Sequence, residues 1–184
     1  MFKTSYVIQK PCRRSISSIN PAKIFTTNAL HVERYFLSFP YCLFMFDYDL
    51  KGKKYRVINF YFYLSDGKEI FVPPMTNLFS GSRVCLPQEA KKYKSFESKK
   101  DFFNFLFNCF WSSSFSSDLD YHVEKYKDEN KKIIDYNYWQ NKTKKNPNWI
   151  PSSKSFLSAK DYDDYDNFKF LSKTFLEMIK KSIH

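Results

Sequence analysis

The chain has 184 residues and a formal net charge of +11 at pH 7, from 30 lysine or arginine and 19 aspartate or glutamate residues. This length allows one domain with extensions or at most two small domains, and no run approaches the roughly 18 apolar residues that a membrane-spanning helix requires. Aromatic residues make up 21% of the sequence, which is ample for a core because each buried aromatic side chain removes about 150–250 Å² from water.

The N-terminal segment is basic, and no acidic residue precedes Glu33. It contains two prolines and shows no clear period, so we expect residues 1–30 to form a basic extended arm with one short strand at Ser5–Ile8. A helix is predicted over Thr27–Phe39. The run Arg13–Ser18 is also compatible with an organelle-targeting segment.

The clearest strand pattern follows this arm. Two long aromatic runs and a shorter apolar run are separated by Lys51-Gly52-Lys53 and by Ser65-Asp66-Gly67-Lys68, and the Asp-Gly pair predicts a hairpin turn because it tolerates positive φ. The predicted strands are Cys42–Leu50, Tyr55–Leu64 and Glu69–Val72. Together they predict an antiparallel β-meander.

Helical patterns dominate the second half of the chain. Ser98 is placed to cap a helix over Lys99–Trp111, whose apolar residues fall on one wide face. A more polar helix is predicted over Lys125–Tyr138. The last helix is predicted to begin after Asn167, with Phe175 and Ile179 among its core-facing residues. Its other predicted core-facing residues are Phe168, Leu171 and Met178.

The expected fold class is therefore α+β, an antiparallel β-meander with packed helices. We expect three parts along the chain. These are a basic extended arm at 1–30, an α+β core domain at 31–135, and a basic loop with the C-terminal helix at 136–184.

The segment Val72–Leu86 leaves the third strand through a double proline, passes Asn77 and Gly81, and ends at Cys85. Two prolines remove two amide donors, so regular strand pairing stops there, and the glycine allows a sharp reversal. Arg83 precedes the cysteine by two residues, so its charge favours a thiolate. The segment predicts a cysteine presented beside an asparagine.

This order of residues resembles the active-site segment of ubiquitin-conjugating enzymes, in particular their divergent prokaryotic relatives of the PRTRC system protein B type. The family pattern is a strand, a proline turn, Pro-Asn, a few residues, and then Gly-Arg-Val-Cys-Leu. Asn77, Gly81, Arg83-Val84 and Cys85-Leu86 match it. A second patch, Phe110–Ser116, looks like the aromatic-Ser-Phe-Ser/Thr run of that branch.

The resemblance covers roughly residues 44–118, and it has departures. Thr76 stands where the family usually has proline, Ser82 is an extra residue between the glycine and the arginine, and Pro87 stands where glycine is common. No histidine precedes the asparagine, although the prokaryotic branch often lacks it too.

The resemblance implies a ubiquitin-conjugating-like fold and a specific chemistry. Cys85 would accept the C-terminus of a ubiquitin-like modifier as a thioester and pass it to an amine. Asn77 would donate to the oxyanion, Arg83 would favour the thiolate, and an activating enzyme would be a partner. A degenerate binding version of the same fold is equally compatible, and so is an ordinary strand role for Cys85.

The remaining chemistry of the sequence is sparse. Cys12, Cys42 and Cys109 are expected to be buried small hydrophobes. Neither the cysteines nor the three histidines have metal-ligand spacing, and the sequence lacks Walker and GxGxxG motifs. We therefore predict no metal and no cofactor, and free thiols suit an intracellular, reducing compartment such as the cytoplasm or an organelle matrix.

The positive charge supports an alternative function, a basic structural subunit of a ribonucleoprotein such as an organellar ribosome, with RNA and neighbouring subunits as partners. Tyr138–Trp149 interleaves aromatics with lysines as a base-stacking surface would, although a surface loop and a solvated lysine surface explain the same pattern. RNA binding requires the arm, Lys51–Arg56 and Lys142–Lys154 on one continuous face. The candidate nucleic-acid-binding residues are Lys3, Lys10, Arg13, Arg14, Lys23, Lys142, Lys144 and Lys145.

Overall fold

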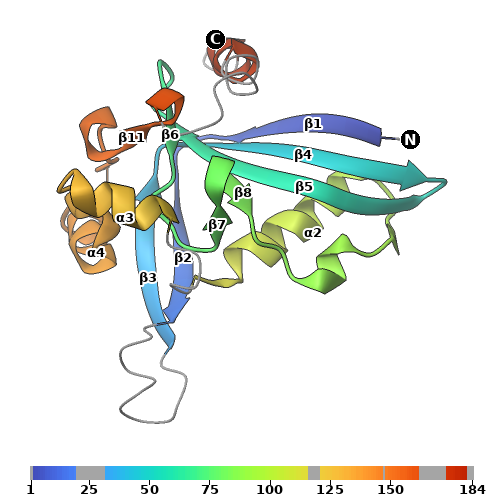
Figure 1. Ribbon diagram of the computed structural model, residues 1–184, viewed down its shortest axis with the longest axis horizontal. Coiled ribbons are helices and arrows are strands. Elements are labelled where there is room, and N and C mark those ends of the chain that lie inside the picture. Colours follow the sequence, from blue (N-terminus) through green and yellow to red (C-terminus); the bar gives the residue numbers. More distant parts are fainter. Residues whose placement is uncertain (1, 20–31, 116–120, 147, 162–172, 182–184) are drawn as a thin grey trace.

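The computed structural model describes residues 2–19, 32–115, 121–146, 148–161 and 173–181, and its architecture is α+β (Figure 1). One sheet has the order β1-β4-β5-β6-β11, with β7, β8 and β9 beside β5, and a second has the order β10-β2-β3. The strands are β1 (Phe2–Gln9), β2 (Cys12–Ile19), β3 (Val32–Phe39), β4 (Tyr41–Lys51), β5 (Lys54–Ser65), β6 (Ile70–Val72), β7 (Leu78–Phe79), β8 (Arg83–Val84), β9 (Lys94–Ser95), β10 (Ser114–Phe115) and β11 (Leu157–Ser158). The helices are α2 (Lys99–Trp111), α3 (Tyr121–Asp128) and α4 (Tyr136–Lys145), and residues 173–181 are also helical.

The predicted meander is confirmed, because β4, β5 and β6 are consecutive antiparallel neighbours. The turn between β5 and β6 is built as the sequence indicates. The Asp66 carboxylate accepts hydrogen bonds from the backbone N–H groups of Lys68 and Glu69, both at 2.9 Å, and Gly67 has a φ of 94°. Turn chemistry of this kind is local, which is why the sequence alone predicts it.

Two antiparallel chain segments, β1–β2 and β3–β4, form a long bent ribbon that shares β4 with this meander. β1 pairs with β4 and β2 pairs with β3 in one shared register, so that Gln9 faces Cys42 before the bend and Cys12 faces Phe39 after it. Each segment has a proline at the bend, Pro11 and Pro40. Beyond the bend, β2 and β3 turn away from the main sheet (Figure 1).

The predictions for the N-terminal part therefore need correction. Residues 2–19 form two paired strands instead of a free arm, and Val32–Phe39 is a strand where a helix was predicted; residues 20–31 lie outside the described residues. Ile16 and Leu37 are buried in the core through this pairing. The partners are far apart in the sequence, so no local pattern revealed it.

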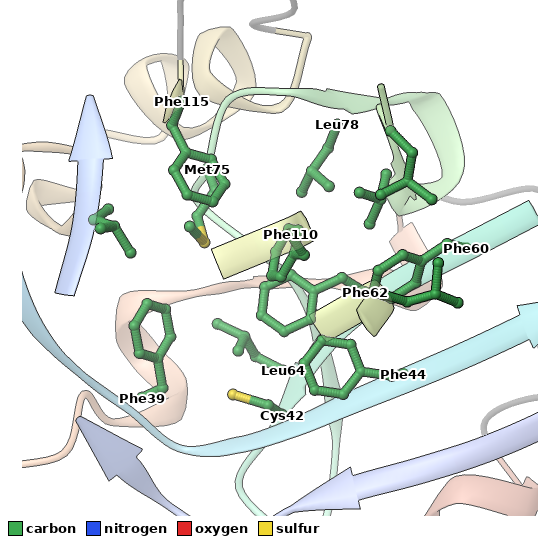
Figure 2. Close-up of a cluster of buried hydrophobic side chains, with 14 of the residues drawn as sticks. Phe39, Cys42, Phe44, Phe60, Phe62, Leu64, Met75, Leu78, Phe110 and Phe115 are labelled. Atoms are coloured by element: carbon green, nitrogen blue, oxygen red, sulfur yellow. The ribbon is translucent and has the colours of Figure 1, made fainter. Parts of the chain in front are cut away.

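The predicted helix over Lys99–Trp111 is confirmed as α2, and the Ser98 side chain accepts the Asp101 backbone N–H at 3.2 Å. Its buried residues pack against one face of the β4–β5 pair, as Figure 2 shows for Phe44, Phe62 and Phe110. Phe62 and Phe110 have ring centroids 4.9 Å apart. The main core of the protein therefore lies between α2 and this face of the sheet.

The region after α2 differs from its prediction. A single helix was predicted over Lys125–Tyr138, but α3 ends at Asp128, Asn130 adopts a φ of 52°, and a new helix begins at Tyr136. The predicted loop after Tyr138 is instead most of α4, and Trp139 within it is fully buried in the main core. The domain boundary expected between residues 135 and 136 therefore separates residues that pack together in one core.

The opposite face of the sheet carries a second apolar cluster. Phe175 and Ile179 of the helical residues 173–181 are fully buried against Leu43 and Tyr63, as predicted for the last helix. Its predicted cap Asn167, with Phe168 and Leu171, lies outside the described residues. No helix among the described residues is both long and apolar enough to cross a membrane.

Candidate functional site around Cys85

The chain from β6 to Cys85 forms a small hairpin against the edge of β5. Pro73 and Pro74 are buried and end the pairing of β6, and β7 and β8 then pair with each other around the turn Ser80–Ser82. Gly81 and Ser82 have φ values of 70° and 55°. The Tyr63 hydroxyl donates to the Gly81 carbonyl at 3.1 Å, which fastens the turn to β5.

Cys85 lies just beyond β8, on the side of the hairpin that faces away from α2. Leu78, Val84 and Leu86 are buried in the main core, whereas Arg83 is exposed and Cys85 is partly exposed. This alternation is that of an extended chain. The thiol is therefore outside the core, as an accessible nucleophile requires.

Asn77 is linked to Cys85 through its backbone and to β10 through its side chain. Its carbonyl accepts the Cys85 N–H at 2.9 Å, which continues the β7–β8 pairing by one residue. Its φ is 63°, and its side-chain amide donates to the Ser114 carbonyl at 2.5 Å. Asn77 thus ties the hairpin to the segment after α2; that it donates to the oxyanion stays a prediction.

Arg83 is the residue of β8 that pairs with Tyr61 of β5. Its guanidinium lies 4.7 Å from the centroid of the Phe79 ring on the opposite strand of the hairpin, a cation–π distance. Burial and the Asp47 carboxylate raise the pKa of the Tyr61 hydroxyl, and the charge of Arg83 opposes this. That Arg83 favours the Cys85 thiolate stays a prediction.

A polar cluster that sequence reasoning missed lies on the same sheet face as Tyr61. The Asp47 carboxylate accepts from the Thr4 hydroxyl at 2.8 Å and from the Asn59 amide at 3.1 Å. The β4–β5 register places Asp47 opposite Asn59, two positions along from the pair that includes Tyr61. Only the pairing of β1, β4 and β5 brings these residues together, so no pattern in the sequence predicts the cluster.

The other cysteines differ in part from expectation. Cys42 is buried, as predicted, but Cys12 and Cys109 are only partly buried. Burial raises the pKa of the Cys109 thiol. Among the described residues there is no group of three or more His, Cys, Asp or Glu that could bind a metal ion.

The candidate RNA-binding residues do not share one face. In β2, exposed Arg13 is directly opposite Ser38 of β3, and exposed Phe36, two positions before Ser38, lies on the same face. Arg14 points to the other face, where its guanidinium lies 5.5 Å from the centroid of the Trp111 ring. Lys3 lies near the start of β1, Lys10 lies at the bend of the ribbon, and Lys23 falls outside the described residues.

The basic zones are also separated along the molecule. The turn between β4 and β5, with the Lys51–Arg56 zone, lies at one end of the main sheet, and α4 lies at the other (Figure 1). The last turn of α4 carries Lys142, Lys144 and Lys145.

Comparison with known proteins gave no match, whether to protein-family models, to curated proteins or to solved structures.

Proposed function

We propose that this protein is ubiquitin-conjugating-like, and that the Cys85 thiol accepts the C-terminal acyl group of a ubiquitin-like modifier as a thioester. The observation that carries the proposal is the pair of hydrogen bonds made by Asn77, from the Cys85 N–H and to the Ser114 carbonyl. These bonds join the two segments on which the resemblance to the PRTRC system protein B type rests. They also fix the cysteine at the end of a short hairpin, outside the core.

The proposed chemistry is a transfer between thioesters. The Cys85 thiolate attacks the modifier's thioester carbonyl, a new C–S bond forms, the C–S bond to the activating enzyme breaks, and that enzyme's thiolate takes up a proton. An amine then attacks the Cys85 thioester, and the amide product leaves Cys85 as a thiol. This chemistry needs a reduced cysteine, so the proposal places the protein in a reducing compartment.

The ribonucleoprotein alternative receives less support from the geometry. It requires the three basic zones on one continuous face, whereas the β4–β5 turn and α4 lie at opposite ends of the main sheet. The described part of its proposed arm, residues 2–19, is paired into the two sheets. Its stacking segment begins with a helix whose Trp139 is buried, so this tryptophan has no open face for a base.

The test uses ubiquitin carrying a C-terminal thioester of a small thiol, which removes the need to know the natural activating enzyme. Incubation with the protein at neutral pH should give an adduct at Cys85 that a reducing thiol reverses. Cys85→Ala should abolish the adduct. Cys109→Ala is the matched control and should leave the adduct unchanged. Cys109 is partly buried like Cys85, but it lies on α2 and not beside the hairpin.

Two results would contradict transfer by Cys85. One is an adduct that survives in Cys85→Ala, and the other is the absence of any adduct in the wild type under conditions in which a small model thiol reacts. In the second case, binding of unmodified ubiquitin to the wild type, measured by NMR shifts around β7 and β8, would indicate the degenerate binding version of the fold.

A further inference from the structure

Asn59 of β5 lies on the same face of the sheet as Cys85. The β5–β8 pairing sets Arg83 opposite Tyr61, and directly opposed residues point to the same face. Asn59 comes two residues before Tyr61, and a step of two residues keeps the face. Cys85 comes two residues after Arg83, and because the pair is antiparallel both steps run the same way along the sheet. Cys85 and Asn59 are therefore level with each other on neighbouring chain segments.

The chain beyond Cys85 also stays beside β5. β9 pairs antiparallel with β5 at Lys54 and Tyr55, so residues 83–95 follow β5 from Tyr61 toward its first residue. Neighbouring strands lie about 4.8 Å apart, and directly opposed Cβ atoms about 4.5–5.5 Å apart. The Asn59 amide is therefore within reach of an acyl group carried by the Cys85 sulfur.

Two hydrogen bonds hold the Asn59 amide in place. Its Nδ2 donates to the Asp47 carboxylate at 3.1 Å, and the other oxygen of that carboxylate accepts from the Thr4 hydroxyl at 2.8 Å. An ionised carboxylate only accepts hydrogen bonds, so the nitrogen end of the amide must face Asp47. This nitrogen carries a second hydrogen, which has no acceptor among the described residues.

The Asn77 amide is committed to a different part of the molecule. It donates to the Ser114 carbonyl in the segment that follows α2, whereas Cys85 lies on the side of the hairpin that faces away from α2. The asparagine that the resemblance assigns to the oxyanion is thus bound elsewhere, and the amide on the face of the thiol belongs to Asn59.

A positive charge lies on the same face. The Arg83 guanidinium is 4.7 Å from the centroid of the Phe79 ring. Its charge opposes the rise in the pKa of Tyr61 that burial and Asp47 cause, so its potential reaches this face of β5. Negative charge that develops beside Cys85 is therefore nearer to Arg83, two residues away, than to Asp47, which lies beyond Asn59 on the next strand.

We propose that Asn59 donates the hydrogen bond that stabilises the oxyanion when an acyl group is transferred at Cys85. The thiolate adds to the acyl carbon, a C–S bond forms, and the electron pair of the carbonyl moves to its oxygen, where the Nδ2–H of Asn59 binds it. The carbonyl re-forms as the bond to the leaving group breaks. Asp47 and Thr4 are positioning residues for this amide, and the natural acyl group rests on the proposed function.

The experiment compares two reactions of Cys85, of which only one forms an oxyanion. Acetylation by p-nitrophenyl acetate passes through a tetrahedral intermediate, whereas alkylation by iodoacetamide does not. Trypsin cleaves after Arg83 and Lys91, and residues 84–91 contain no other cysteine, so the mass of this peptide follows Cys85 in the full chain. Asn59→Ala should slow acetylation at least about tenfold and leave alkylation unchanged.

Further variants separate an oxyanion donor from a structural role. Asn59→Gln keeps the donor on a longer side chain and should regain part of the acetylation rate, and Asp47→Ala should slow acetylation selectively but by less than Asn59→Ala does. Asn104→Ala, on the exposed face of α2, should change neither reaction.

Three results would overturn the proposal. The first is an equal acetylation rate in wild type and Asn59→Ala, and the second is a parallel loss of both reactions in Asn59→Ala and Asn59→Gln. The third is a selective loss in Asn77→Gly that is absent from Asn59→Ala. If the ubiquitin thioester fails to load Cys85 while Asn59→Ala still slows acetylation selectively, the proposed function fails and the role of Asn59 stands.

Discussion

Asn77 offers the sharpest test of the site, because its backbone and its side chain contribute separately. Its φ of 63° lies in the left-handed region, and its amide donates to the Ser114 carbonyl. Asn77→Gly removes the hydrogen bond but keeps a residue that accepts positive φ. Asn77→Ala removes the same bond and adds a Cβ that the left-handed conformation disfavours.

The expected losses follow from these two contributions. A hydrogen bond of this kind contributes about 1 kcal/mol net, and a left-handed alanine costs roughly 1–2 kcal/mol more than an allowed conformation. Asn77→Ala should therefore reduce the free energy of unfolding by about 2–3 kcal/mol. Asn77→Gly should reduce it by about 1–1.5 kcal/mol, which includes part of the backbone entropy of glycine.

Urea unfolding followed by tryptophan fluorescence measures both losses, provided the slope against urea stays constant. Asn104→Ala, on the exposed face of α2, is the control and should change stability by less than about 0.5 kcal/mol. Equal losses for the alanine and glycine variants would refute the left-handed backbone. Losses as small as that of the control would refute the bond to Ser114, and with it the observation that carries the proposed function.

Three further predictions concern other described residues. Ser82 has a φ of 55° and a buried hydroxyl without a hydrogen-bond partner among the described residues, so Ser82→Gly should raise the unfolding free energy by about 1 kcal/mol, whereas Ser82→Ala should gain less, because it removes the hydroxyl but keeps the backbone penalty. The fully buried Tyr126 hydroxyl donates to the Val72 carbonyl at 2.5 Å and accepts from the Leu157 N–H at 3.1 Å; Tyr126→Phe should cost about 2–4 kcal/mol in the same assay by leaving both groups unpaired, and a cost below about 1 kcal/mol would contradict these bonds. The pKa of Cys12 is lowered from 9.0 to about 6 on folding, so its contribution to stability is complete above pH 9 and is lost as the pH falls through 6. The difference in unfolding free energy between wild type and Cys12→Ser, measured under reducing conditions, should therefore widen from pH 6 to pH 9. A difference that stays constant would contradict the lowered pKa of Cys12.

The sequence by itself determined those elements whose causes are local. Asp66-Gly67 specified the turn of the meander, Ser98 and the helical spacing of the apolar residues after it specified α2, and the double proline ended β6. Each of these signals acts within a few residues, through backbone conformation, a capping hydrogen bond or the loss of an amide donor. The position of Cys85 beyond a proline turn that follows this meander was predictable for the same reason.

The tertiary structure alone decided how distant segments meet. The strands of 2–19 were not predicted, because charged and polar residues surround the few buried ones. Ile16 of β2 is in the core, whereas Ser15 is exposed and Ser17 is partly exposed. The pairing of the N-terminal ribbon joins residues between 13 and 47 positions apart, and the bond from Asn77 to Ser114 joins residues 37 positions apart. Such contacts depend on strand register and on the bend at the two prolines, and neither leaves a periodic trace in the sequence.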